Sequence, residues 1–319
     1  MALRSYASLA DESSPLVRAA STLALQDVVQ LAYLACLLAA VYRGAGPERP
    51  GALAWLLFDA LVFVAGVVAW RGVSKPSRAA RNAYRVATCA PVIATFGQLH
   101  LILPTASDLR LDAALLAFDE GVLRYEPSLA WDARVSPALT EWFSFFYLGY
   151  FAVLALHVVP VLVFERRGRV LAEFSLGIVT VYCAGHALYL AVPALGPWVH
   201  LAGEFHNPLQ GDFWYPLMCR VVAAGGARTD VFPSLHTAGP AFIAMFSFRH
   251  RAQRPFRYTW PLVAFVTSQI IAATMYLRWH YLIDVIAGLA LAAAAAYGAK
   301  ALCAWESTAR ARRALPPVW

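Results

Sequence analysis

Long runs of apolar residues, separated by short polar segments, recur along almost the whole chain. Eight such runs lie near 23–42, 52–70, 86–104, 142–164, 170–193, 234–249, 259–277 and 281–303. Several contain the ~20 residues that a helix needs to cross a bilayer. Ala- and Leu-rich stretches such as LALAAAAAYGAKAL favour helix, and no ten-residue alternation typical of a membrane barrel occurs. The pattern predicts an all-α, polytopic membrane bundle of about eight transmembrane helices.

The composition agrees with a membrane protein. Hydrophobic residues make up 60% of the 319 residues and charged residues 14%, whereas soluble domains carry about 25% charged residues. The net charge is +7, and the basic residues fall mostly between the apolar runs. We therefore attribute the charge to membrane topology and expect no nucleic-acid partner. The five cysteines are scattered without a CxxC pair, which predicts neither a disulfide framework nor a thiolate metal site.

The charge of the connecting segments alternates along the chain. Of the 26 Lys and Arg residues, 18 fall at the termini and in alternate connections, and the other eight in the segments 43–51, 105–141, 194–232 and 278–280. Positive segments stay in the cytoplasm, so both termini are predicted to be cytoplasmic. Residues 105–141 mix apolar and acidic residues at roughly helical spacing, which predicts short surface helices on the outer face.

Two polar motifs interrupt the apolar runs on this predicted outer face. FPSLHT (232–237) opens the sixth run, where Pro233 suits a helix start and Ser234 can cap it or bind a ligand. The free amides of a helix start attract anions, and His236 lies among them. MYLRWHYLID (275–284) forms the turn between the last two runs and places His280 and Asp284 one helical turn apart.

This combination of residue types suits phosphoryl transfer. One imidazole can attack phosphorus while a carboxylate holds its other nitrogen. A second imidazole can protonate the leaving oxygen, and helix amides with an arginine can bind the remaining oxygens. The chain lacks an evident acidic cluster suited to Mg²⁺, so we expect a reaction without a metal or other cofactor.

FPSLHT and YLRWHYLIDVIAG resemble the second and third signature motifs of the type-2 phosphatidic acid phosphatase superfamily. More narrowly, FPSLH followed by TMYLRWHYLIDVIAG resembles the branch of inositol phosphorylceramide synthases, over about 170–301. The resemblance implies that His280 is the nucleophile that becomes phosphohistidine, that Asp284 orients it, and that His236 is the general acid and later the base. It also implies that Ser234 helps to bind phosphate.

Two departures from the superfamily pattern concern the phosphate-binding cations. The region of the first motif, VPALGPWVH (192–200), contains no Lys or Arg, and Thr274 stands where the wider superfamily has an arginine. The second departure is shared with the synthase branch and favours it. Of the outer arginines 220, 228 and 278, we expect Arg228 and Arg278 to bind the substrate phosphate.

The resemblance implies three parts: two N-terminal transmembrane helices (1–85), a six-helix catalytic core (86–304) and a cytoplasmic tail (305–319). It also implies a phosphotransferase that moves a phospho-headgroup from a phospholipid donor to a lipid hydroxyl acceptor at the outer leaflet. A lipid phosphate or polyprenyl diphosphate phosphatase with the same site is the alternative. A transporter is disfavoured, because the polar cluster lies at one rim of the membrane.

The Ala- and Arg-rich, Lys-poor composition favours a bacterial inner membrane, with the active site on the periplasmic or lumenal face. The oligomeric state is left open. Within the spans, we expect Asp59 to face the bundle or a polar cavity and to pair with a histidine. We expect His100, His157 and His186 to hydrogen-bond between helices.

Overall fold

The computed structural model describes residues 14–73 and 77–319, so the first 13 residues, with their expected cytoplasmic position, lie outside the described part. A long helix occupies each of the eight expected places. These helices are α3 (Leu25–Arg43), α4 (Arg49–Arg71), α5 (Arg78–Ala106), α8 (Pro137–Phe164), α9 (Gly168–Ala191), α12 (Leu235–Arg249), α13 (Phe256–Tyr276) and α14 (Leu282–Arg312). No strand occurs among the described residues, where an isolated β-bridge joins Ala194 to Asp230. The predicted all-α fold is confirmed.

Six of these helices, within the described residues, are long and apolar enough to cross a membrane: α3, α4, α5, α8, α9 and α14. They fit a multi-pass membrane protein. Helix α12 has 15 residues, fewer than the ~20 that span a bilayer, and most of its residues are buried among the neighbouring helices. The count of eight spans therefore stays a prediction.

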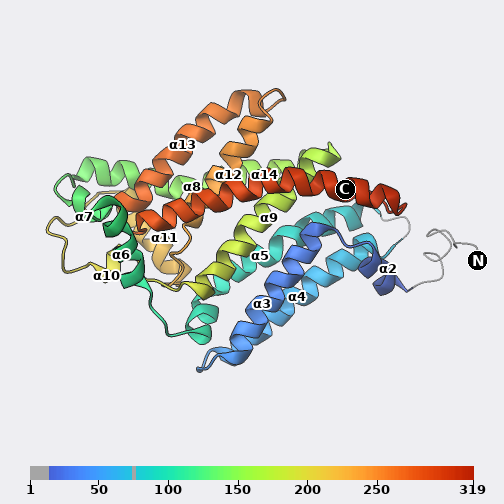
Figure 1. Ribbon diagram of the computed structural model, residues 1–319, viewed down its shortest axis with the longest axis horizontal. Helices are drawn as coiled ribbons and strands as arrows, with labels where there is room; N and C mark the ends of the chain where they lie inside the picture. The colour runs from blue at the N-terminus through green and yellow to red at the C-terminus, as the bar shows by residue number, and fades with distance from the viewer. Residues whose placement is uncertain (1–13, 74–76) are drawn as a thin grey trace, which may run out of the picture.

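The short helices of the outer connections gather at one end of the bundle (Figure 1). They are α6 (Asp112–Leu123) and α7 (Pro127–Asp132) in the first expected outer connection, with α10 (Pro197–His200) and α11 (Trp214–Gly225) in the second. Helix α2 (Pro15–Ser21) and the C-terminus lie at the opposite end (Figure 1). The short helices expected in 105–141 are present, whereas α10 and α11 were not anticipated from the sequence.

Two helices extend further than their apolar runs. Helix α5 begins at Arg78, where the Ser77 side chain accepts a hydrogen bond from the Ala80 amide at 3.1 Å and caps the helix. Helix α14 continues through residues expected to form a tail and ends at Arg312. There Arg310 donates hydrogen bonds to the carbonyls of Thr22 and Leu23, each at 3.1 Å. The end of α14 is thereby attached to the start of the N-terminal helices.

Polar groups inside the bundle are paired in ways that the sequence predicted only in part. His186 contacts the Tyr33 hydroxyl of α3 at 2.8 Å, so its interhelical hydrogen bond is present. His100 and His157 instead contact carbonyls of their own helices, at 2.8 Å each. Asp59 is buried and accepts a hydrogen bond from Gln98 at 2.9 Å, so its partner is an amide and not a histidine.

Candidate active site

The starts of α12 and α14 lie against each other and carry the two polar motifs. Ser234 caps α12, because its hydroxyl oxygen accepts a hydrogen bond from the Thr237 amide at 3.2 Å. The Ser234 amide donates to the Asp284 carbonyl at 3.0 Å and joins the two helix starts. This approach requires glycine at 288, since a Cβ there would lie 2.6 Å from the Ser234 carbonyl oxygen. The two motifs are therefore held together by backbone atoms.

His280 and Asp284 form a buried pair at the start of α14. The His280 Nδ1 lies 3.3 Å from Asp284 Oδ2, and the same oxygen accepts the Tyr281 amide at 2.9 Å. His280 is 4% exposed and Asp284 is fully buried. A carboxylate can only accept here, so Nδ1 carries the proton and Nε2 is the nitrogen that retains a lone pair for chemistry.

His236 lies between two tyrosine rings of α8. Its ring centroid is 4.2 Å from those of Tyr147 and Tyr150, and the planes are tilted by 17° and 31°. The His236 and His280 centroids are 6.4 Å apart. His236 Nε2 is buried and finds no hydrogen-bond partner among the described residues. The aromatic stack fixes the imidazole plane and leaves a polar atom available to a substrate.

The turn that presents His280 is closed by backbone contacts. The amides of Trp279 and His280 both donate to the Thr274 carbonyl, at 2.9 and 3.2 Å. Arg278, between them and the helix, adopts a left-handed conformation with φ 67°, which usually favours glycine at a helix end. Thr274, where the wider superfamily has an arginine, thus contributes a carbonyl acceptor to the turn.

The segment 192–200 packs directly on this turn. Gly196 has φ +82°, and a Cβ there would lie 2.5 Å from the Trp279 carbonyl oxygen. The Trp198 amide donates to the Arg278 carbonyl at 2.7 Å. The region that corresponds to the superfamily's first motif therefore lies beside His280, although it carries no basic residue.

Arg278 and Arg228, the two arginines expected to bind phosphate, lie in different surroundings. The Arg278 guanidinium donates to Asp132 Oδ1 at 2.8 Å and to the Asn207 carbonyl at 2.5 Å, and it stacks on Phe205 at 3.9 Å. Its Nε is buried and unpaired among the described residues, and burial lowers its pKa. Arg228 is exposed, with no hydrogen bond or ion pair found within the described part of the chain. The phosphate-binding role of both stays a prediction.

Acidic residues of the first outer connection hold the site together. Asp119 accepts hydrogen bonds from the Leu282 amide and, at 2.9 Å, from the Ile283 amide, and so caps α14. Asp112 accepts the Leu195 and Gly196 amides at 2.9 and 2.8 Å. These two roles were not expected from the sequence. Their spacing of seven residues on an amphipathic helix was the available signal, because it places both carboxylates on one face.

Asp230 is a further carboxylate that the sequence analysis did not assign. It lies two residues before FPSLHT, and burial raises the pKa of its carboxyl while the nearby His280 opposes that shift. Its backbone pairs with Ala194 in the isolated bridge. Within the described residues, no group of three or more His, Cys, Asp or Glu side chains is arranged to hold a metal ion.

A sequence model of the PAP2 superfamily matches residues 113–298. No curated protein and no solved structure gives a significant match. The matched region begins in α6 and ends within α14, and it contains both polar motifs and every residue of the histidine–aspartate site. Because it covers more than half of the 319 residues, the chain belongs to the PAP2 superfamily, which is generally a family of phosphatases and phosphotransferases, and this membership supports a lipid enzyme of that type.

Proposed function

We propose that this protein is a membrane phosphotransferase that moves a phospho-headgroup from a phospholipid to a lipid hydroxyl through phosphohistidine. The observation that carries the proposal is the buried His280–Asp284 pair, with Nδ1 and Oδ2 3.3 Å apart, beside His236 at the start of α12. Membership of the PAP2 superfamily supports the general class of reaction. The resemblance of FPSLH and TMYLRWHYLIDVIAG to the inositol phosphorylceramide synthases supports transfer over hydrolysis.

In the first half-reaction, the Nε2 lone pair of His280 attacks the phosphorus of the bound phospholipid. A nitrogen–phosphorus bond forms, and the bond from phosphorus to the diacylglycerol oxygen breaks. His236 donates its proton to that leaving oxygen. Asp284, bound to the opposite nitrogen, stabilises the positive charge that develops on the His280 ring.

In the second half-reaction, a lipid hydroxyl attacks the phosphorus of phosphohistidine. Its proton passes to His236, the new oxygen–phosphorus bond forms and the bond to His280 breaks. The same site would act as a phosphatase if water attacked instead, so a transferase must exclude water until the acceptor is bound. The aromatic rings of Tyr147 and Tyr150, which enclose His236 from two sides, support such exclusion.

Donors at the start of α12 surround the place assigned to the phosphate. The helix amides carry partial positive charge, and Ser234 lies beside them. The Thr237 hydroxyl is buried without a partner among the described residues. The unpaired Arg278 Nε and the exposed Arg228 complete the proposed phosphate-binding set.

We place the active site on the outer face of the membrane, which in a bacterium is the periplasmic face of the inner membrane. The excess of Lys and Arg in the alternate connections supports this orientation. A peptide tag after Trp319 should then be protected from protease in sealed right-side-out vesicles. Cleavage of the tag in intact vesicles would reverse the orientation.

Purified protein in detergent, given phosphatidylinositol or phosphatidic acid with a labelled phosphate, tests the reaction. Ceramide and diacylglycerol are offered as acceptors. The proposal predicts that label moves onto an acceptor lipid, and that His280→Asn abolishes this transfer. His200→Asn, which changes an exposed histidine of the same outer face, is the matched control and should retain it. Label released as phosphate or as a water-soluble headgroup, regardless of acceptor, would identify a hydrolase instead.

A further inference from the structure

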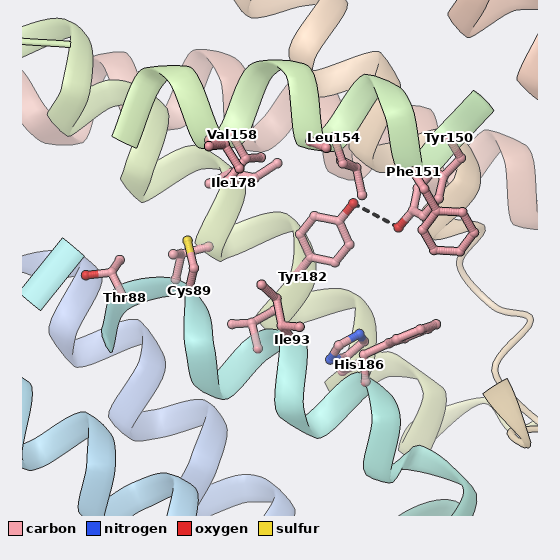
Figure 2. A pocket seen from close by; sticks show the side chains of 15 residues that line it. Thr88, Cys89, Ile93, Tyr150, Phe151, Leu154, Val158, Ile178, Tyr182 and His186 are labelled. Carbon is pink, nitrogen blue, oxygen red and sulfur yellow. Dashed lines mark hydrogen bonds between the residues drawn. The ribbon is translucent and has the colours of Figure 1, made fainter. Parts of the chain in front are cut away.

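A cavity of about 330 Å³ lies between α5, α8 and α9, beside the histidine site. Figure 2 shows that its wall is built from aliphatic and aromatic side chains of these three helices, including Ile93, Leu154, Val158 and Ile178. The volume falls within the range of about 300–1,000 Å³ that small-molecule sites occupy. None of the described residues that line it is charged, so its occupant must be apolar over most of its surface.

The cavity is elongated along the helices. On α8 its lining extends from Tyr150 to Val159, and on α5 from Thr88 to Phe96. A helix rises about 1.5 Å per residue, so these stretches are about 12–14 Å long. All three helices are long and apolar enough to cross a membrane, where lipid would surround them. A hydrocarbon chain has the length, shape and polarity that such a slot accepts.

One end of the cavity adjoins the catalytic site. Tyr150 and Phe151 line the cavity and also contact His236, with ring centroids at 4.2 and 6.5 Å. The Tyr150 hydroxyl is bound to the Tyr182 hydroxyl at 2.9 Å, as Figure 2 shows. Polar groups thus gather at the end near His236. A lipid with its chain in the cavity would present its polar end to the site.

His186 also lines this end of the cavity and is fully buried (Figure 2). The direction of its hydrogen bonds follows from its neighbours. We assign the one hydroxyl proton of Thr95 to the Val92 carbonyl, 3.1 Å away, so that Tyr33 donates to Thr95 at 2.7 Å. In this arrangement the Tyr33 hydroxyl accepts from His186 at 2.8 Å, which places the imidazole proton on Nδ1.

This assignment leaves His186 Nε2 as a bare acceptor. The atom is buried and has no hydrogen-bond partner among the described residues. A buried acceptor without a partner is costly, and the cavity beside it is the available place for one. The complementary group is a hydroxyl or an amide N–H, both of which donate. The ester oxygens of a diacyl phospholipid only accept.

We propose that the cavity binds the hydrocarbon chain of a lipid that carries a hydroxyl or amide donor near its polar end, and that His186 Nε2 accepts a hydrogen bond from that donor. The assignment of this lipid as the acceptor substrate rests on the proposed phosphotransferase function. The binding itself follows from the cavity and from the unpaired nitrogen.

Photolabelling tests the binding without turnover. The probe is a diacylglycerol with a diazirine in one acyl chain, and its O-methyl ether is the analogue that cannot donate. The free alcohol should label α5, α8 and α9, and the ether should label them about fivefold less, the loss expected from one hydrogen bond. His186→Leu should remove this difference between the two probes.

Two separate substitutions, one on α8 and one on α5, each fill the cavity, so the test does not depend on the folding of a single variant. Ala155→Trp and Cys89→Phe both add bulk at lining positions and should lower labelling by either probe at least fivefold. Leu156→Trp, at a neighbouring position that is 71% exposed, is the matched control and should label like the unchanged protein. Unchanged labelling in both filled variants, or a preference for the alcohol that persists in His186→Leu, would overturn the proposal.

The outcome separates this inference from the proposed function. If the protein labels as expected but transfers no phosphate, the proposed lipid site stands and the proposed phosphotransferase function fails. If it transfers phosphate while the filled variants label normally, the proposed function stands and the proposed lipid site fails.

Discussion

Replacing Asp284 with Asn separates the charge of this carboxylate from its geometry. Asp284 Oδ2 accepts from both His280 Nδ1 and the Tyr281 amide, whereas Oδ1 is buried and unpaired among the described residues. An Asn oxygen in the Oδ2 position retains both hydrogen bonds. In the opposite rotamer, the Asn NH₂ group would face the two N–H donors, which is unfavourable. The variant should therefore keep the His280 tautomer and lose only the negative charge.

The expected loss of rate follows from the electrostatic interaction. The His280 ring becomes positively charged during phosphoryl transfer, with Nδ1 3.3 Å from Asp284 Oδ2. Two unit charges about 4 Å apart interact by about 4 kcal/mol at an effective dielectric constant of about 20. Since 1.36 kcal/mol changes a rate tenfold, Asp284→Asn should lower kcat about a thousandfold. Asp284→Ala also removes the two hydrogen bonds and should lower kcat further.

The assay measures initial rates of label transfer at saturating donor and acceptor, beside thermal unfolding in the same detergent. Asp284→Asn should unfold at nearly the temperature of the unchanged protein, because both hydrogen bonds have an acceptor. A loss below tenfold in a folded Asn variant would refute the role of the charge. Equal losses for Asn and Ala would show that Asp284 acts through its charge alone and that its two hydrogen bonds add nothing to the rate.

Three further predictions concern the outer elements and the metal requirement. Asp119→Ala removes the acceptor of two α14 amides and should lower the stability by about 1–2 kcal/mol in detergent unfolding, whereas Glu120→Ala, at an exposed neighbour, should not. Although burial opposes it, hydrogen bonds from the amides of the 206–207 segment and the charge of Arg278 hold the pKa of Asp132 below its usual 3.8. Ionised Asp132 therefore stabilises the folded protein above pH 3.8, and this contribution is lost as the pH falls through the lower pKa of the folded state. In unfolding measurements over a pH series, the stability difference between the wild type and Asp132→Asn should shrink below about pH 4. EDTA should leave label transfer unchanged; strong inhibition that Mg²⁺ reverses would contradict the expected metal-free reaction.

The parts of the fold that could be predicted are those with a local signal. Apolar runs located the long helices, and FPSLHT identified a helix start, because capping and hydrophobicity act within a few residues. The His280–Asp284 contact was predictable for the same reason, since four residues make one helical turn. The end of α14 was not predictable, because its extension is held by contacts with a distant segment. The start of α5 at Arg78 was missed although Ser77 provides a local capping signal.

The remaining features depend on contacts between distant segments. Asp119 binds amides some 160 residues further along the chain, and no periodicity within α6 identifies that partner. The same holds for Tyr147 and Tyr150, which read as ordinary apolar residues of a span until α12 is placed against them. The side chain of Arg278 could not be assigned either, because its pairing with Asp132 joins segments 146 residues apart.

The hydrogen bond from the Ser234 amide to the Asp284 carbonyl has an evolutionary consequence. Since the spacing of the two histidines is set by main-chain atoms, substitutions at outer positions that do not contact this junction, unlike Asp112 and Asp119, can accumulate without altering it. Divergence in specificity within the superfamily would then leave its mark on the outer segments and on the helix faces toward the lipid, and spare the junction of α12 with α14.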